Sequence, residues 1–381
     1  MRSKKKMTAI GLACLLTVSA PFGSMAQEKP ESMDQETWER LQDNVLEYDE
    51  IGNLVEYYNP TYQQALQNVQ INIQPYEDAA EQLRGTAKEL IDDAKNEKDD
   101  NVMLYMTYRG YAKGYQEAAK TFEKVAQKIK SSTRSTLNSA RKQLTSGVQQ
   151  LILGYYQALA SKELVDTAAE LSQAAYDSTL TQRNLGMATD GDVQSALKSL
   201  QSAQAQQQSL NDTLTSLKRN LQFMTGWSYD AQVDIGEAPV PDLSRIDGMN
   251  PENDLPTAIG NNYTLLGQRR ASANSTADRD AKMRTLDESE AKIKVQLDTL
   301  YQEVAQSKAA YEASLLALES ANLTMAGNEK KYEMGMLGRL EYLQLKLAYL
   351  QQKMAADAAS LNLVQAIENY NWAVEGLADI S

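Results

Sequence analysis

Histidine is absent from this 381-residue sequence, and cysteine occurs once, as Cys14 near the N-terminus. The chain therefore offers no ordinary Cys/His metal site and no disulfide pair. Acid–base chemistry would fall to carboxylates, lysine or tyrosine, and we find neither a glycine-rich phosphate loop nor paired carboxylates in a pocket-forming context. The composition argues against an enzyme and predicts no metal or cofactor.

Proline is missing from two long stretches, from Tyr76 to Ala238 and from Thr257 to the C-terminus. Both stretches are rich in alanine, glutamine, leucine, lysine and glutamate, which favour helices. Four of the eight prolines fall between residues 227 and 260, which predicts an acidic linker with a short strand at residues 231–236. We therefore predict an all-α fold with one interruption.

Basic residues are outnumbered 38 to 51. Residues 1–26 are predicted to be a signal peptide, with a basic start, an apolar run over 8–18 and the cleavage site Ser24-Met25-Ala26. The run is too short to span a membrane, and Gly11-Leu12-Ala13 before Cys14 fits a lipoprotein signal poorly. Removal of the signal leaves 34 basic and 51 acidic residues, a balance of −17. This balance argues against nucleic acid and anionic lipid as partners.

Residues 183–226 predict a helical hairpin tip followed by a long helix. Gly186, Gly191, Thr189 and Asp190 crowd the break, where glycine supplies positive φ and Thr or Asp can cap the outgoing helix. Apolar residues then recur at spacings of three and four, with one polar interruption at Gln207, which predicts a coiled-coil seam. The seam comprises Val193, Ala196, Leu200, Ala203, Gln207, Leu210, Leu214, Leu217, Leu221 and Met224.

Residues 331–376 repeat this unit. Superposing Gly186 on Gly335 aligns Met187 with Met336 and Asp192 with Glu341, and brings the closing Gly226 within one residue of Gly376. The repeats also begin alike, because Asn59-Pro60-Thr61 is a good helix start and Asn262 and Thr264 take the corresponding places. We predict long antiparallel coiled-coil hairpins in two tandem repeats, residues 59–226 and 261–381, after an acidic, amphipathic segment at 27–58 and joined by the 227–260 linker.

The two tips, "RNLGMATDGDV" and "KYEMGMLGRLEYL", resemble those of the TolC-type outer membrane efflux proteins. The resemblance implies a homotrimer whose helices form an α-helical barrel, a passive conduit that is docked to a periplasmic adaptor (membrane-fusion) protein and an ABC or other inner-membrane pump. It implies adaptor-binding tips at Leu185, Gly186, Met187, Met334, Gly335 and Met336. It also implies a gate at Asp192, Tyr332, Arg339, Glu341 and Gln344, with Arg339 replacing a basic partner that is absent at Leu337.

Three alternatives stay open at these residues. The tip side chains could simply close the hairpin ends, Asp192 could only cap its helix, and Glu341 could be a solvated helix residue. The Gln-, Ser- and Thr-rich face of residues 193–217 suits a wetted tunnel wall, although the sequence alone favours an ordinary exposed coiled-coil face. An extracytoplasmic scaffold or surface-interaction protein without channel activity is therefore the second interpretation.

The sequence also departs from the family at the expected membrane strands. Each repeat of the family is interrupted by two outer-membrane strands, which need about ten residues of alternating polarity. We find no such segments, and the chain resembles a member that lacks evident β-barrel strands. Residues 82–134 predict an extra helical segment in the first repeat instead. The predicted location is the cell envelope, at the outer membrane or in a cell-wall or periplasm-like space.

Overall fold

The computed structural model describes residues 29–30, 33–98, 101–228 and 230–380. The predicted signal peptide at 1–26 lies outside these residues. Nearly everything described is helical, and the prediction of an all-α chain built from long antiparallel hairpins is confirmed. Across the described residues, none of the helices combines the length and the apolar character that crossing a membrane requires.

Short elements precede the long helices. They are α1 (Gln35–Arg40), β1 (Val45–Leu46), a 3₁₀ turn (Tyr48–Glu50) and α2 (Ile51–Tyr58). β1 pairs in parallel with β2 (Asp234–Ile235), so the short strand predicted at 231–236 is confirmed. This pair ties the segment before the first repeat to the linker after it.

The first repeat contains α3 (Pro60–Glu97), α4 (Val102–Ala160), α5 (Lys162–Asn184) and α6 (Asp190–Met224). The predicted helix start is confirmed, since Pro60 opens α3 and the Asn59 side chain accepts a hydrogen bond from the Tyr62 amide. α4 and α5 are separate helices because the chain breaks at Ser161. The Ser161 amide and hydroxyl both donate to the Ala158 carbonyl, which tightens the chain locally.

The second repeat contains α9 (Tyr263–Arg270), α10 (Thr276–Glu333) and α11 (Arg339–Trp372), closed by a π-helical turn at Ala373–Leu377. Two further helices, α7 (Leu243–Asp247) and α8 (Pro251–Asn261), lie between the repeats. α9 takes the place that the much longer α3 has in the first repeat. The α3–α4 hairpin therefore has no counterpart of similar length, in agreement with the extra helical segment predicted at 82–134.

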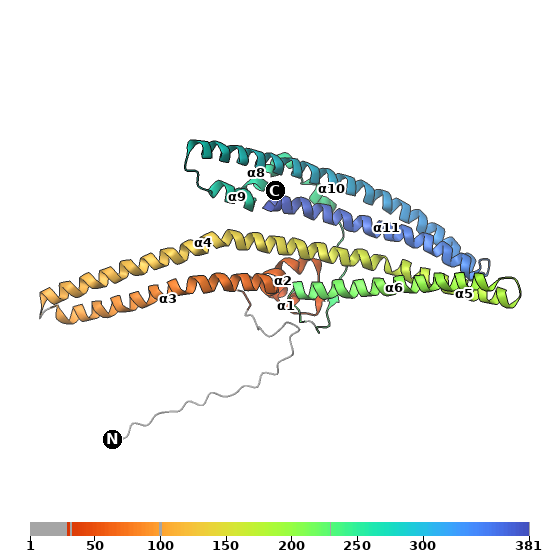
Figure 1. The fold of residues 1–381 in the computed structure, drawn as a ribbon, viewed down its shortest axis with the longest axis horizontal. Coiled ribbons are helices and arrows are strands. Elements are labelled where there is room, and N and C mark those ends of the chain that lie inside the picture. Colours follow the sequence, from red (N-terminus) through yellow and green to blue (C-terminus); the bar gives the residue numbers. More distant parts are fainter. Residues whose placement is uncertain (1–28, 31–32, 99–100, 229, 381) are drawn as a thin grey trace, which may run out of the picture.

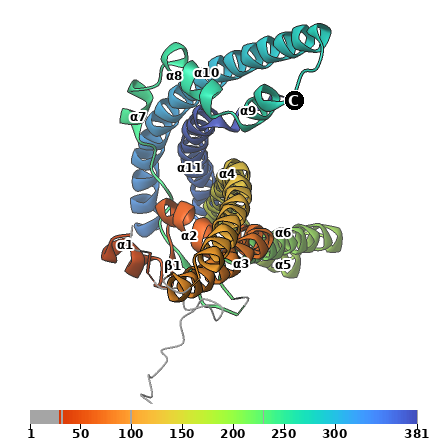
Figure 2. The same ribbon diagram turned by 90° about the vertical axis from the view of Figure 1, so that its left-hand side faces the viewer.

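The two tip-bearing hairpins share one end of the molecule. Figure 1 shows the α5–α6 turn and the α10–α11 turn at the right-hand end, whereas the α3–α4 hairpin extends to the opposite end beyond every other helix. Figure 2 shows α10 and α11 together on one side of α4, with α5 and α6 on another. The molecule is an elongated rod, with both hairpin tips at one end and the α3–α4 hairpin projecting from the other.

Two buried clusters lie at the middle of the rod, where the short elements meet the long helices. The first joins α2 and α4 to the strand pair, and its members that are at most 2% exposed are Leu41, Leu46, Ile51, Leu54, Val55, Val148, Ile152, Leu153, Leu221 and Val233. The second joins α8 and α9 to α10 and α11, and the corresponding members are Ala258, Leu265, Ile293, Leu297, Val304, Leu363, Ile367 and Tyr370. α11 contributes Leu361 and Val364 to the first cluster and Leu363 and Ile367 to the second, so it connects the two repeats.

Each repeat closes on an asparagine and a glycine. The buried Asn59 side chain donates to the Met224 carbonyl at 2.6 Å, and the buried Asn262 side chain donates to the Ala378 carbonyl at 2.8 Å. Gly226 and Gly376 both have positive φ, 86° and 100°. These joints confirm the sequence correspondence of Asn59 with Asn262 and support the internal duplication.

Alanines form the inner seam of the α3–α4 hairpin. Every seventh residue is buried on both helices, and these residues are Ile73, Ala80, Ala87 and Ala94 on α3 and Ala112, Ala119 and Ala126 on α4. A strict repeat of seven keeps one face of each helix against its partner, and side chains this small allow a close approach of the two helices. The Tyr76 ring of α3 also lies beside the Phe122 ring of α4, with ring centroids 6.4 Å apart.

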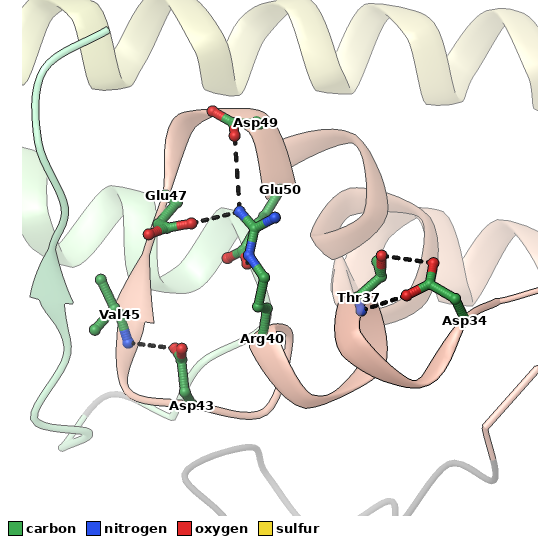
Figure 3. Close-up of polar contacts among 8 residues, drawn as sticks. All are labelled: Asp34, Thr37, Arg40, Asp43, Val45, Glu47, Asp49 and Glu50. Carbon is green, nitrogen blue, oxygen red and sulfur yellow. Dashed lines mark hydrogen bonds and ion pairs between the residues drawn. The ribbon is translucent and has the colours of Figure 1, made fainter.

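A buried carboxyl in the N-terminal segment makes the stability of that segment depend on pH. Figure 3 shows Arg40 beside the carboxylates of Glu47, Asp49 and Glu50. The Arg40 Nε lies 3.0 Å from the Glu50 carboxylate. Burial raises the pKa of Glu50 to about 7, although the positive charge of Arg40 opposes this rise. In the unfolded chain the same carboxyl loses its proton near its ordinary value of 4.5.

This difference predicts the effect of Glu50→Gln. Between pH 4.5 and about 7 the folded chain still holds the Glu50 proton, whereas the unfolded chain has released it. The free energy of unfolding therefore falls as the pH rises through this window. Glutamine stays neutral at every pH, so the variant does not lose this stability. The thermal midpoint of the variant minus that of the unmodified protein should therefore be larger at pH 8 than at pH 5. Midpoints of Glu50→Gln and of the exposed control Asp49→Asn, measured at both pH values, test this. A pH-independent difference for Glu50→Gln would contradict it.

Candidate functional site

The two hairpin tips have the same backbone. The Gly186 amide donates to the Arg183 carbonyl and the Gly335 amide to the Tyr332 carbonyl, each at 2.9 Å. Both glycines have positive φ, 75° and 70°, which L side chains rarely adopt. α6 and α11 begin four residues after their glycine, so Asp192 and Glu341 are both third residues of their helices. The superposition predicted from the sequence is confirmed at the level of individual hydrogen bonds.

Apolar side chains flank both tip glycines and face solvent. The exposed fractions are 70% for Leu185, 75% for Met187, 66% for Met334 and 68% for Met336. These side chains do not close the hairpin ends on themselves, which was the alternative interpretation. Four exposed apolar side chains at one end of the molecule are a candidate contact surface, and methionine adapts to varied apolar partners.

Polar contacts hold the first tip. Arg183 at the end of α5 pairs with Asp190 at the start of α6 at 2.9 Å. Thr189 and Asp192 form a capping box, and these hydrogen bonds from the Thr189 amide and hydroxyl lower the pKa of Asp192. The expectation that Gly191 supplies positive φ is wrong, since Gly191 lies in the first turn of α6 and only Gly186 has that conformation here.

The five predicted gate residues fall into separate contacts. Asp192 serves its own helix cap, Tyr332 stacks on Tyr342 with ring centroids 4.2 Å apart, and Arg339 pairs with Glu170 of α5 at 2.9 Å. Glu341 and Gln344 are exposed on the first turns of α11. Among the hydrogen bonds and ion pairs of the described residues, none joins Asp192 to Tyr332 or Arg339.

Charged residues link the two repeats along α5 and α11. Lys353 pairs with Glu163 at 2.9 Å, and Lys346 lies 3.8 Å from the same carboxylate. Together with Arg339–Glu170 these pairs form a ladder along the two helices. All five side chains are at least 30% exposed, so each pair contributes little to stability by itself.

Sequence reasoning missed the acidic partners of this ladder. The signal was present, because Glu163 and Glu170 are seven residues apart, as are Arg339, Lys346 and Lys353. Charges repeated every seven residues are typical of the flanks of a coiled-coil seam. The structure also explains the polar interruption of the α6 seam, since the Gln207 amide donates to Asp166 of α5 at 2.6 Å and lowers the pKa of that carboxyl.

No known family model matches the sequence, and no curated protein sequence matches it. Solved structures that are similar to the chain include the outer membrane protein VceC of Vibrio cholerae, with 11% identity over 87% of this chain and 97% of that one and a TM-score of 0.48. The outer-membrane channel OprN has 11% identity, coverages of 99% and 98%, and a TM-score of 0.49. The CmeC outer membrane channel of Campylobacter jejuni has 12% identity, coverages of 100% and 95%, and a TM-score of 0.40.

Proposed function

We propose that this chain is a TolC-like efflux conduit of the cell envelope, a passive component of a tripartite export system. The observation that carries the proposal is the pair of matching tips at one end of the molecule, each with a positive-φ glycine between exposed apolar side chains. The duplicated hairpins and the tip sequences that resemble the TolC-type proteins support it. The chain would catalyse nothing, and the inner-membrane pump, an ABC transporter or another class, would supply the energy.

The contact surface for the adaptor is the set of residues around the two glycines, Leu185, Gly186, Met187, Met334, Gly335 and Met336. Burying four large apolar side chains against a helical hairpin provides binding free energy without specific hydrogen bonds. Two tips per chain would give three equivalent pairs of tips in a homotrimer. The polar face of residues 193–217, whose Gln194, Ser199 and Gln206 are exposed, would line the wetted wall.

A gate would lie beside the tips. Asp192 and Glu341 place two carboxylates per chain at the third positions of α6 and α11, and Gln344 adds an exposed polar side chain one turn later. In a trimer these carboxylates would form a constriction that attracts cations. Tyr332 and Arg339 would regulate its width, because Tyr332 braces α11 through Tyr342 and Arg339 ties α11 to α5.

The tips are tested with a fourfold variant, Leu185→Asp, Met187→Asp, Met334→Asp and Met336→Asp. Its affinity for the purified adaptor encoded with an export pump in the source genome is expected to fall at least about thirtyfold, which corresponds to about 2 kcal/mol. The side chains point into solvent, so helicity by circular dichroism should not change. Biolayer interferometry of the two proteins measures the affinity.

The matched control is Leu316→Asp with Leu323→Asp, two α10 residues that are 69% and 74% exposed but lie away from the tips. An affinity that drops as much in the control as in the tip variant, or in neither, would contradict docking through the tips. The mass of the unmodified protein by light scattering tests the conduit itself. A strictly monomeric protein would favour the scaffold interpretation.

A further inference from the structure

The two helices of the projecting α3–α4 hairpin carry opposite charges. Between Tyr76 and Glu97, α3 has seven acidic and three basic residues, whereas α4 has seven basic and two acidic residues between Val102 and Arg134. Only two ion pairs join the helices within the described residues, Arg84–Glu123 and Lys130–Glu77. Two further pairs form within single helices, Asp92–Lys95 on α3 and Glu117–Lys120 on α4. Most of the remaining charge faces outward.

The outward charges lie on the sides of the hairpin that face away from the alanine seam. On α3 they are the exposed carboxylates Asp78, Glu81, Glu89 and Asp92. On α4 they are the exposed ammonium groups of Lys113, Lys120, Lys124 and Lys128. Glu117 is the one acidic residue on this face of α4 between Lys113 and Lys128. Figure 1 shows that this end of the hairpin runs beyond the other helices, so no other described element covers either side.

Glycines mark the centre of both outward faces. Gly85 lies two residues before the seam residue Ala87, and Gly110 and Gly114 lie two residues on either side of the seam residue Ala112. A step of two residues turns about 200° around a helix, which places these glycines opposite the seam. A Cβ added at any of the three would meet nothing within 4 Å. No contact inside the hairpin requires these glycines, although each costs about 1 kcal/mol relative to alanine within a helix.

Gly85 and Gly114 also lie at the same height on the hairpin. Tyr76 of α3 contacts Phe122 of α4, and the glycines follow and precede that contact by nearly equal lengths of chain. When two hairpins stand side by side and point the same way, α3 of one would meet α4 of the other with Gly85 opposite Gly114. Small residues at such a crossing let two helix backbones approach closely.

We propose that the outward face of α4 binds the outward face of α3 in a second copy of this chain, with the α3 carboxylates against the α4 lysines. Each hairpin then contacts two neighbours through different faces, so the contact is heterologous, and in the proposed homotrimer three such contacts close a ring. In that ring the hairpins extend the tunnel away from the adaptor end. The inference rests on the proposed homotrimer, whose interface it assigns to residues outside the tips and the gate.

Engineered cysteines test the contact in the full chain. Cys14 is the only native cysteine, so Cys14→Ser with Gly85→Cys and Gly114→Cys leaves one pair. Within one hairpin the two thiols point away from each other across two helices, each about 10 Å wide, which exceeds the reach of a disulfide. Mild oxidation should therefore give a ladder up to a covalent trimer on a denaturing gel. The matched control combines Thr86→Cys with Gly114→Cys, which moves the α3 thiol off the outward face. This control should crosslink much less.

A charge reversal tests the same surface without cysteines. Lys113→Glu with Lys124→Glu should weaken association at least tenfold in sedimentation at low salt, and added Asp78→Lys with Glu89→Lys should restore it. If the protein is a trimer but crosslinks no more than the control, and its association is unchanged by the charge reversal, this interface is wrong. The proposed conduit function would not be affected by that result. An unmodified protein that is monomeric would instead defeat the proposed function itself. Circular dichroism confirms that each variant folds.

Discussion

Gly376→Ala is expected to destabilise the protein by about 4 kcal/mol. An L residue at a φ of 100° is strained by about 1–3 kcal/mol. The added Cβ would also lie 2.3 Å from the Asn261 carbonyl oxygen, so the backbone must move. That movement separates the buried Asn262 amide from the Ala378 carbonyl, and an unsatisfied buried amide costs about 1–3 kcal/mol more. Chemical denaturation followed by circular dichroism measures the loss.

Gly226→Ala should behave in the same way in the first repeat, because its Cβ would lie 2.3 Å from the Tyr58 carbonyl oxygen. The matched control is Gly186→Ala at the tip, where φ is 75° but nothing lies within 4 Å of the added Cβ. The control has the conformational strain without the collision, so it should cost only about 1–2 kcal/mol. If Gly376→Ala costs no more than Gly186→Ala, the joint does not depend on close backbone contact.

This joint illustrates what the sequence could and could not predict. Asn59-Pro60 identified a helix start, and Gly226 and Gly376 aligned as the ends of two repeats. Local rules for capping and for glycine are sufficient for such boundaries. That Gly226 touches Tyr58, and Gly376 touches Asn261, depends on contacts across more than a hundred residues, which helix periodicity does not specify.

The candidate site shows the same division. The turn geometry of both tips and the exposure of Met187 and Met336 agree with the sequence-based superposition, because each tip is a local structure. The partners of Tyr332 and Arg339 were not predicted. The resemblance implies only that both residues belong to a gate, whereas in the structure the Tyr332 ring stacks on Tyr342 across the second tip.

Ala87→Leu combined with Ala119→Leu is expected to open the projecting hairpin. Both alanines lie in the α3–α4 seam and are at most 1% exposed, so a larger side chain has no space unless the helices separate. Overpacking at one site costs about 1–3 kcal/mol, and the two sites face the same interface. Hydrogen exchange of the α3 and α4 amides should become much faster between residues 76 and 130. The buried clusters around Ile152 and Leu297 should keep their protection, because they lie outside this part of the hairpin.

Thr86→Leu is the matched control, since Thr86 is the exposed neighbour of Ala87 and offers room for leucine. Its exchange should match that of the unmodified protein. The seam variant also separates the two proposals for this chain, because an open hairpin cannot present its outward faces in register, whereas the tips lie at the opposite end. Association through α3 and α4 should therefore weaken. The affinity of the tips for the adaptor, measured at concentrations where the chain is monomeric, should stay within about twofold of that of the unmodified protein. Unchanged exchange in the seam variant would mean that the alanines do not set the distance between the helices.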